Sequence, residues 1–242
     1  MKRSPVLPVL AALAALFFSA CGIEDFIYLY PVVNIPHDPT SSEDESAKYF
    51  CFTTRDSENS SAEPDNFKGY EIYYRIYNTA SARATDVSAI STANDSNPTG
   101  IVTVLTGRNY QRMTSTKRLT NYPLIPGTGT DRTVYIRLAD YETVPSRIFA
   151  GALDVDSLPS IDSSEDLGIP LRTMDGLSDA SDTAFRFDPE EFDSDDGDVS
   201  YSTSGDGCWY VQAYVVAYGY DGSYKSIYSE AKSLGAITLP LE

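Results

Sequence analysis

Few side chains in this 242-residue chain have the type and spacing that chemistry requires. The one histidine, His37, stands in an extended stretch flanked by prolines. Neither a histidine cluster for zinc nor a Ser-His or Cys-His nucleophile is therefore indicated. The glycines of PGTGTDR, Gly127 and Gly129, lack the lysine and the strand-to-helix context of a phosphate loop and indicate a turn. We therefore predict no catalytic residue and no cofactor.

The residue types that bind hard metal ions gather in one acidic stretch. Sixteen Asp and Glu residues lie between positions 154 and 206, against only Arg172 and Arg186, and their centre is FDPEEFDSDDGDVS. Calcium takes six to eight oxygen ligands, which such loops can supply. The spacing of an EF-hand is absent, however, because Gly197 follows Asp193 by four positions rather than five. We therefore predict a solvated acidic loop and no metal site.

The first twenty residues have the pattern of an export signal. Two basic residues precede an apolar stretch over positions 6–18, which is too short to span a bilayer as a helix. The sequence FSAC at positions 18–21 resembles the lipobox of bacterial lipoproteins. This resemblance implies a signal peptide over 1–20 and acylation of Cys21, which becomes the new N-terminus. An ordinary secretory signal cleaved near Ala20 is the alternative.

The lipoprotein resemblance implies an exported protein attached to a membrane of the cell envelope by its N-terminal lipid. In that family a residue such as Gly22 after the cysteine is compatible with transfer to an outer membrane, which we therefore expect rather than the inner one. The folded domain is expected to lie close to the membrane, because FIYLY at 26–30 has the composition of folded chain and leaves little linker after Cys21. Loss of the leader's two basic residues takes the net charge from −17 to −19, which excludes nucleic acid as a partner.

Short segments rich in β-formers, with alternating side chains, predict an all-β fold. Gly, Pro, Asn and Asp clusters bound these segments, which favours an antiparallel β-sandwich or barrel. The segments are KYFCFTTRD, KGYEIYYRIYN, GIVTVLTG, RTVYIRLADYE and CWYVQAYVVAYG.

Two of these segments are similar to parts of a fibronectin type III domain. NFKGYEIYYRIYN resembles its third strand, with Ile72, Tyr74 and Ile76 on one face. The stretch from Tyr210 to Gly235 resembles its last hairpin, with the turn near 221–222. The resemblance implies one β-sandwich domain over 21–242, with core halves at 24–80 and 205–242. The segment 81–204 is then a large, partly irregular insertion that holds the middle strands and the acidic loop.

Two cysteines remain once Cys21 carries lipid. An oxidising compartment permits a disulfide between Cys51 and Cys208 without requiring one, and two unrelated thiols are the alternative. In the sandwich model Cys51 lies on the second strand and Cys208 at the start of the sixth. Immunoglobulin-type sandwiches place their bridge between sheets at roughly these positions, whereas fibronectin-type domains generally lack it. The cysteines therefore support a sandwich and leave its subfamily open.

Tyrosines form the most informative surface that the alternation predicts. If Val211, Ala213, Val215 and Ala217 face the core, the tyrosines of the two long strands point to the opposite face. Either the insertion covers this face, which we favour, or the face binds a partner. The tyrosines concerned are Tyr73, Tyr77, Tyr210, Tyr214 and Tyr218.

These patterns together predict an envelope lipoprotein that is not an enzyme and acts by binding or by structural interaction. Its partner is expected to be a protein or a carbohydrate, in addition to the membrane that holds the lipid. Two alternatives remain: an exported enzyme acting on carbohydrate, and a non-catalytic subunit of an envelope complex.

Overall fold

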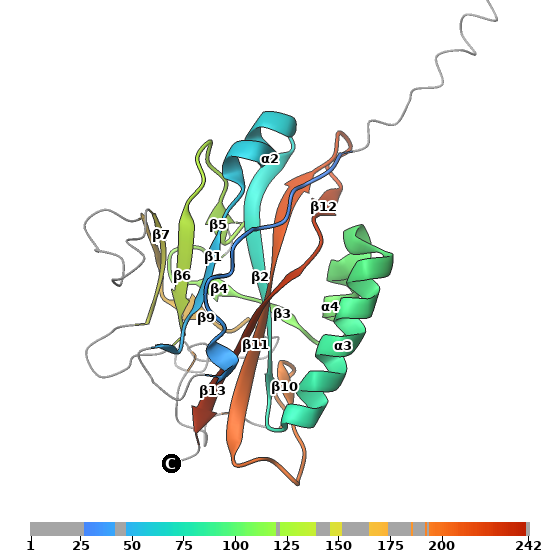
Figure 1. The fold of residues 1–242 in the computed structure, drawn as a ribbon, viewed down its shortest axis with the longest axis vertical. Helices are drawn as coiled ribbons and strands as arrows, with labels where there is room; N and C mark the ends of the chain where they lie inside the picture. Colours follow the sequence, from blue (N-terminus) through green and yellow to red (C-terminus); the bar gives the residue numbers. More distant parts are fainter. Residues whose placement is uncertain are drawn as a thin grey trace, which may run out of the picture.

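Two β-sheets face each other across the main hydrophobic core, and two helices cover the outer face of the larger sheet (Figure 1). The computed structural model describes residues 27–41, 47–119, 122–138, 146–151, 165–173, 185, 192 and 194–240. Within these residues the chain is mostly β-strand in antiparallel sheets, with three α-helices. The predicted all-β class is therefore confirmed at this level.

The smaller sheet has four strands in the order β1-β6-β7-β8, all antiparallel. Its strands are β1 (Phe50–Thr53), β6 (Thr133–Arg137), β7 (Arg147–Gly151) and β8 (Glu165–Gly168). A separate two-stranded sheet pairs β4 (Thr114–Ser115) with β9 (Pro170–Leu171).

The larger sheet has seven strands and is built on the long pair β2 and β11. All its pairs are antiparallel except β10 with β2. Strands β10, β2, β11 and β12 lie side by side in that order. In addition, β13 pairs with β11, and the short strands β3 and β5 pair with β2. The strands are β2 (Phe67–Tyr77), β3 (Gln111–Arg112), β5 (Ile125–Pro126), β10 (Val199–Ser200), β11 (Cys208–Tyr220), β12 (Ser226–Tyr228) and β13 (Lys232–Pro240).

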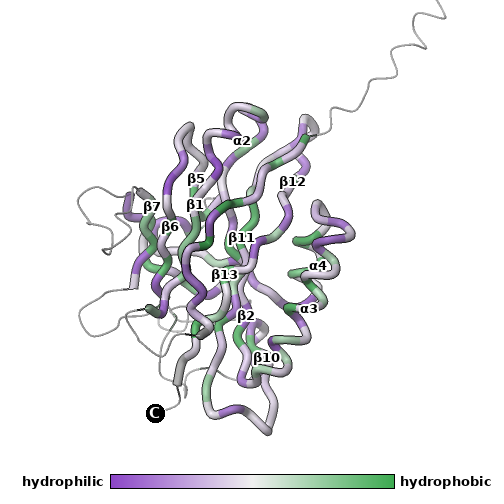
Figure 2. The backbone as a smooth tube through the Cα atoms, in the orientation of Figure 1, coloured by the Kyte–Doolittle hydropathy of each residue, from purple (hydrophilic) through white to green (hydrophobic). Residues whose placement is uncertain are grey.

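Side chains of both sheets fill the core between them, as period-2 alternation requires. Ile72, Tyr74 and Ile76 of β2 point into this core, as predicted, together with aliphatic residues of β6 and β7. The predicted inward set of β11 is also confirmed. It consists of Val211, Ala213, Val215 and Ala217. The hydropathy tube shows hydrophobic stretches along β6, β7 and β11, where this core lies (Figure 2).

The two helices on the larger sheet come almost entirely from the region predicted as an insertion, and one of them corrects a predicted strand. GIVTVLTG was predicted as a strand, but Ile101–Gly107 is helix α4, because its residues Ile101 and Leu105 lie one helical turn apart and are both fully buried. The 17-residue helix α3 (Ala80–Ser96) precedes it and ends before Pro98, which begins the short 3-10 helix η3 (Pro98–Gly100). Together α3 and α4 form a third layer.

Two further short helices bind the N-terminal segment to the sheets. Helix α2 (Asp56–Ala62) connects β1 to β2, and the 3-10 helix η1 (Pro39–Ser41) packs against β13. At η1, the hydroxyl of Thr40 accepts a hydrogen bond of 2.7 Å from the backbone N–H of Ala236. The N-terminal segment therefore lies across both sheets before β1 begins.

Candidate functional site

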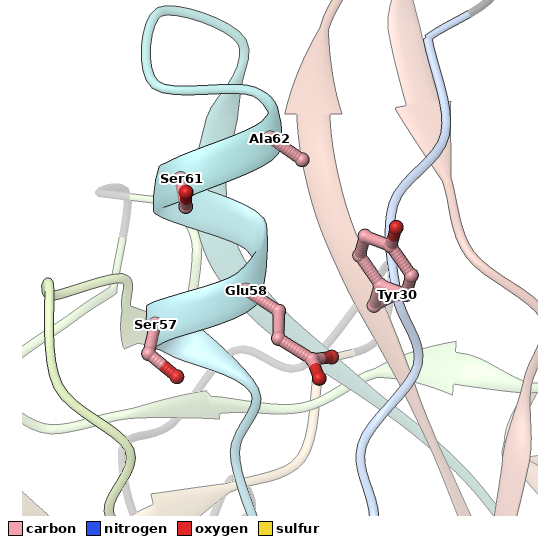
Figure 3. Close-up of a pocket in the computed structure, with 5 residues that line it drawn as sticks. All are labelled: Tyr30, Ser57, Glu58, Ser61 and Ala62. Atoms are coloured by element: carbon pink, nitrogen blue, oxygen red, sulfur yellow. The ribbon is translucent and has the colours of Figure 1, made fainter.

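A hollow of about 420 Å³ lies between helix α2 and the N-terminal segment. Figure 3 shows Glu58 extending from the helix toward the ring of Tyr30, with Ala62 one turn further along. Both elements lie near one end of the long axis of the molecule (Figure 1). The hollow is lined by Tyr30, Ser57, Glu58, Ser61 and Ala62; we call it the α2 groove.

Buried polar side chains fix the two walls of the α2 groove relative to each other. Asn59 is fully buried, accepts a hydrogen bond of 2.7 Å from the backbone N–H of Tyr30, and donates one of 2.9 Å to its carbonyl oxygen. The amide of one wall therefore holds the backbone of the other at two points. This makes the groove a formed feature of the fold.

Asp56 anchors the first turn of α2 to the body. Its Oδ2 accepts hydrogen bonds from the backbone N–H and the hydroxyl of Thr128, at 3.1 and 2.7 Å, and forms an ion pair with Arg132. Burial raises the pKa of Asp56 against the lowering effect of these partners. One residue further, the backbone N–H and the hydroxyl of Ser57 both donate to Asp131. The start of the helix is therefore held by side-chain contacts from both residues.

The polar groups on the residues that line the groove are the Glu58 carboxylate and the hydroxyls of Tyr30, Ser57 and Ser61. Glu58 forms an ion pair with Arg55, whose guanidinium carbon lies 4.8 Å from the ring centroid of Tyr30. The Ser61 hydroxyl makes no hydrogen bond to another described residue. Hydrogen-bond donors and acceptors beside an aromatic ring are suited to a small, hydroxyl-rich ligand.

The predicted tyrosine face lies on the opposite side of the larger sheet from the main core, but the protein's own helices cover it. Four of its five tyrosines are at most 4% exposed, and Tyr210 is half-buried. Ile90 of α3, Leu105 of α4 and the following Tyr110 pack against it. The insertion therefore covers Tyr73, Tyr77 and Tyr214, which belong to a second core, whereas the buried ring of Tyr218 contacts Tyr220 and Tyr228 of the larger sheet. The tyrosines are Tyr73, Tyr77, Tyr210, Tyr214 and Tyr218.

Charged groups are also buried within this second core. Glu71 is fully buried and accepts hydrogen bonds from the Tyr73 hydroxyl at 2.8 Å and from Arg112 at 2.9 Å. Asp86 of α3 accepts a hydrogen bond of 2.8 Å from the Tyr77 hydroxyl. Burial raises the pKa of both tyrosines well above the ordinary value. These hydroxyls therefore stay protonated and act as structural donors.

The predicted disulfide is not present, and both cysteines are free. Phe50 and Phe52 point into the main core, so Cys51 between them points to the outer face of the smaller sheet. Trp209 points into the main core, so Cys208 next to it points toward the outer face of the larger sheet. The two thiols therefore lie on the outer faces of opposite sheets. Cys21, the predicted lipidation site, lies outside the described residues.

Acids of the predicted acidic loop that the structure describes have structural contacts. Asp198 is fully buried and forms two hydrogen bonds with Arg172, of 2.8 and 2.6 Å, and one of 2.7 Å with the Tyr74 hydroxyl. Asp196 also pairs with Arg172. Across the described part of the chain, no three His, Cys, Asp or Glu side chains gather in a way that could hold a metal ion.

His37 stacks on Tyr49 at a centroid distance of 4.3 Å. Its Nε2 lies 2.5 Å from the carbonyl oxygen of Ala47, to which it donates. The ring is half-buried rather than free on a surface loop. It therefore has a packing role in the described structure.

Sequence reasoning missed the α2 groove. Helix α2 itself has recognisable signals, since Asp56 and Glu58 lie in its first turn and Pro64 follows its end. Nothing in the sequence indicates that Tyr30, which lies 29 residues before Asn59, would form the second wall.

No family model matches the chain, and no curated protein or solved structure matches it. None of the helices in the described ranges is both long and apolar enough to cross a membrane.

Proposed function

We propose that the protein is a lipid-anchored lipoprotein of the bacterial envelope that acts by binding, and that the α2 groove is its ligand site. The lipobox-like residues at 18–21 support the anchor, and Gly22 supports the outer membrane as its destination. The observation that carries the binding role is the α2 groove, whose walls are joined through the buried amide of Asn59. A site with walls fixed in advance loses little entropy when a ligand enters.

The chemistry of the groove favours a saccharide among small ligands. Sugar hydroxyls can donate hydrogen bonds to the Glu58 carboxylate and accept them from the neighbouring Arg55 guanidinium. The C–H face of the sugar ring can pack on the aromatic ring of Tyr30. A glycosidase would use a second carboxylate roughly 5–10 Å from the first. Glu58 is the only acid among the described residues that line the groove, which supports binding over hydrolysis.

A fibronectin type III-like sandwich remains part of this proposal. The adjacency of β1 and β6 in one sheet, and of β2, β11 and β13 in the other, supports it. The helical layer of α3 and α4 is an addition to that plan. In this proposal the sandwich supplies a rigid body, and the segment that precedes β1 supplies one wall of the site.

The anchor is tested by Cys21→Ala. The variant should leave the membrane fraction and lose labelling by a fatty-acid probe, because the proposed lipid on Cys21 is its attachment and the rest of the chain is acidic. Fractionation of cells and in-gel detection of the probe measure both properties. Persistence of the unlabelled variant in washed membranes would contradict the anchor.

The groove is tested by filling it. Ser61→Leu should abolish retention on an array of bacterial envelope oligosaccharides, because the larger side chain occupies the hollow. Glu58→Gln should weaken retention by about tenfold, through loss of one charged acceptor. Ser81→Leu, at an exposed position of α3, is the matched control and should bind as the wild type does. Equal binding by all three variants would refute the site.

A further inference from the structure

Tyr224 is the most exposed large hydrophobic side chain among the described residues, with 86% of its surface accessible. It lies in the turn between β11 and β12 and has a φ of +62°, a left-handed conformation that is unusual for an aromatic residue. Strained backbone of this kind persists only where the surrounding structure enforces it. An outward-pointing tyrosine held in this way calls for a functional explanation.

Asp221 fixes this turn. Its carboxylate accepts hydrogen bonds from the backbone N–H and the hydroxyl of Ser223 and from the backbone N–H of Lys225, at 2.7–2.8 Å. Its carbonyl oxygen also accepts the N–H of Tyr224 at 2.9 Å. The turn is therefore rigid, and it presents the tyrosine ring with most of its surface open.

The turn lies at the same end of the body as the first described residues. Figure 1 shows the first described residues, helix α2 and the β11–β12 turn at the same end of the long axis. Tyr28, the second described residue, is also exposed, at 43%. Cys21 and Tyr28 are separated by a stretch of chain that spans at most about 25 Å when fully extended. A lipid on Cys21 would therefore keep this end close to the bilayer.

We propose that Tyr224 and Tyr28 dock this end of the body into the headgroup region of the bilayer that carries the lipid anchor. The inference rests on the proposed function, because it requires Cys21 to be lipidated. Tyrosine suits this position, since its ring enters the interface while its hydroxyl stays hydrated. The acidic body has no electrostatic attraction to anionic lipid, so uncharged aromatic contacts fit it better than a basic patch.

The anchor makes such weak contacts effective. A tethered group meets the bilayer at a high effective concentration, so two tyrosines that would not bind a membrane alone can set the orientation of the body. The long axis would then stand away from the membrane. Tyr201 follows β10, beside the far end of β2, and lies about 35 Å from the turn if β2 has an ordinary strand rise.

The test places tryptophan reporters at the two ends of the full-length, lipidated protein. Tyr224→Trp is compared with Tyr201→Trp, a matched control that is 53% exposed at the opposite end. Both variants keep Trp209, which is buried, and the wild type supplies its background signal. The proteins are reconstituted into phosphatidylethanolamine and phosphatidylglycerol vesicles, with and without brominated acyl chains. Flotation with the vesicles reports the anchor independently.

The reporter at position 224 should shift to shorter emission wavelength and lose fluorescence on brominated lipid, whereas the reporter at 201 should do neither. Flotation without quenching at position 224 would overturn the docking but leave the anchor standing. Failure to float would overturn the anchor, and the docking with it. Equal quenching at both positions would show a body lying on its side and would overturn the orientation. Shielding of position 224 only after a soluble protein partner is added would overturn the lipid assignment.

Discussion

Replacing Asp86 by alanine should loosen the helical layer from the larger sheet. Asp86 is one of only two buried residues of α3, together with Ile90. Its Oδ2 accepts hydrogen bonds from Arg75 at 2.7 Å and from the Tyr77 hydroxyl at 2.8 Å, and its Oδ1 accepts one from Arg108 at 2.5 Å. One carboxylate therefore joins the helix to two positions on β2 and to the residue that follows α4.

The size of the effect follows from the exposure of these partners. A hydrogen bond to a charged acceptor, such as the one from Tyr77, contributes about 1.5–3 kcal/mol to stability. The loss is smaller here, because the Tyr77 hydroxyl keeps a second partner, the hydroxyl of Tyr110 at 3.0 Å. The Arg75 pair is mostly buried and contributes about 1 kcal/mol, whereas the pair with Arg108, which is 35% exposed, contributes less because solvent screens it. A loss of about 3 kcal/mol lowers the Tm by about 6–12 °C for a domain of this size.

Differential scanning calorimetry measures this change, and ANS fluorescence reports exposure of the tyrosine face. Asp95→Ala, an exposed acid on the same helix, is the control and should change the Tm by less than about 2 °C. Tyr77→Phe should cost less stability in the Asp86 variant than in the wild type, because the hydrogen bond to Asp86 is already lost and only the one to the Tyr110 hydroxyl remains. A Tm within about 2 °C of the wild type, or full additivity of the two changes, would refute the reasoning.

Two further predictions concern the thiols and a glycine. Cys51 and Cys208 should both be alkylated as free thiols in unfolded protein purified under oxidising conditions. In the folded protein Cys51 should react slowly with the alkylating reagent, because burial raises its pKa to about 11 and leaves about a thousandth of it as thiolate at pH 8. Peptide mapping that recovers a bridged pair would contradict this. Gly69→Ala should destabilise the fold severely, because φ is +142° and a Cβ there would collide with the carbonyl oxygen of Ile125. Gly222→Ala is the control and should be nearly neutral, because the space around Gly222 is open. Urea denaturation measures both effects.

The sequence was informative where side chains alternate. The two faces of β2 and β11 could be assigned from the residue pattern alone, because Ile72 and Val211 alternate with tyrosines. The same rule could have excluded the disulfide, since phenylalanines on both sides of Cys51 already direct its thiol away from the core between the sheets.

The helical layer could not be predicted in the same way. Most of α3 is Ala, Ser, Thr and Asn, so the helix has almost no apolar periodicity, and polar contacts through Asp86 join it to the sheet. The β-branched residues of α4 favour a strand locally. The segment is nevertheless helical, because a helix lets both Ile101 and Leu105 pack on the tyrosine face. The α2 groove depends on contacts between distant segments, which composition does not record.

Strand β2 separates two cores, and that position determines the order in which the chain can fold. Its main neighbour, β11, lies near the C-terminal end of the described chain, and Tyr74 of β2 pairs there with Ala213. The Tyr74 hydroxyl also bonds to Asp198, which is 124 residues away in the sequence. Contacts between residues this far apart in the sequence form late in folding, because closing the long intervening loop costs conformational entropy. If the chain is exported from its N-terminus, as proposed, β2 would emerge before its neighbour β11, while Ile90, Leu105 and Tyr110, which pack on its tyrosine side, follow it closely in the sequence. The two cores are completed only after residues 208–220 have followed.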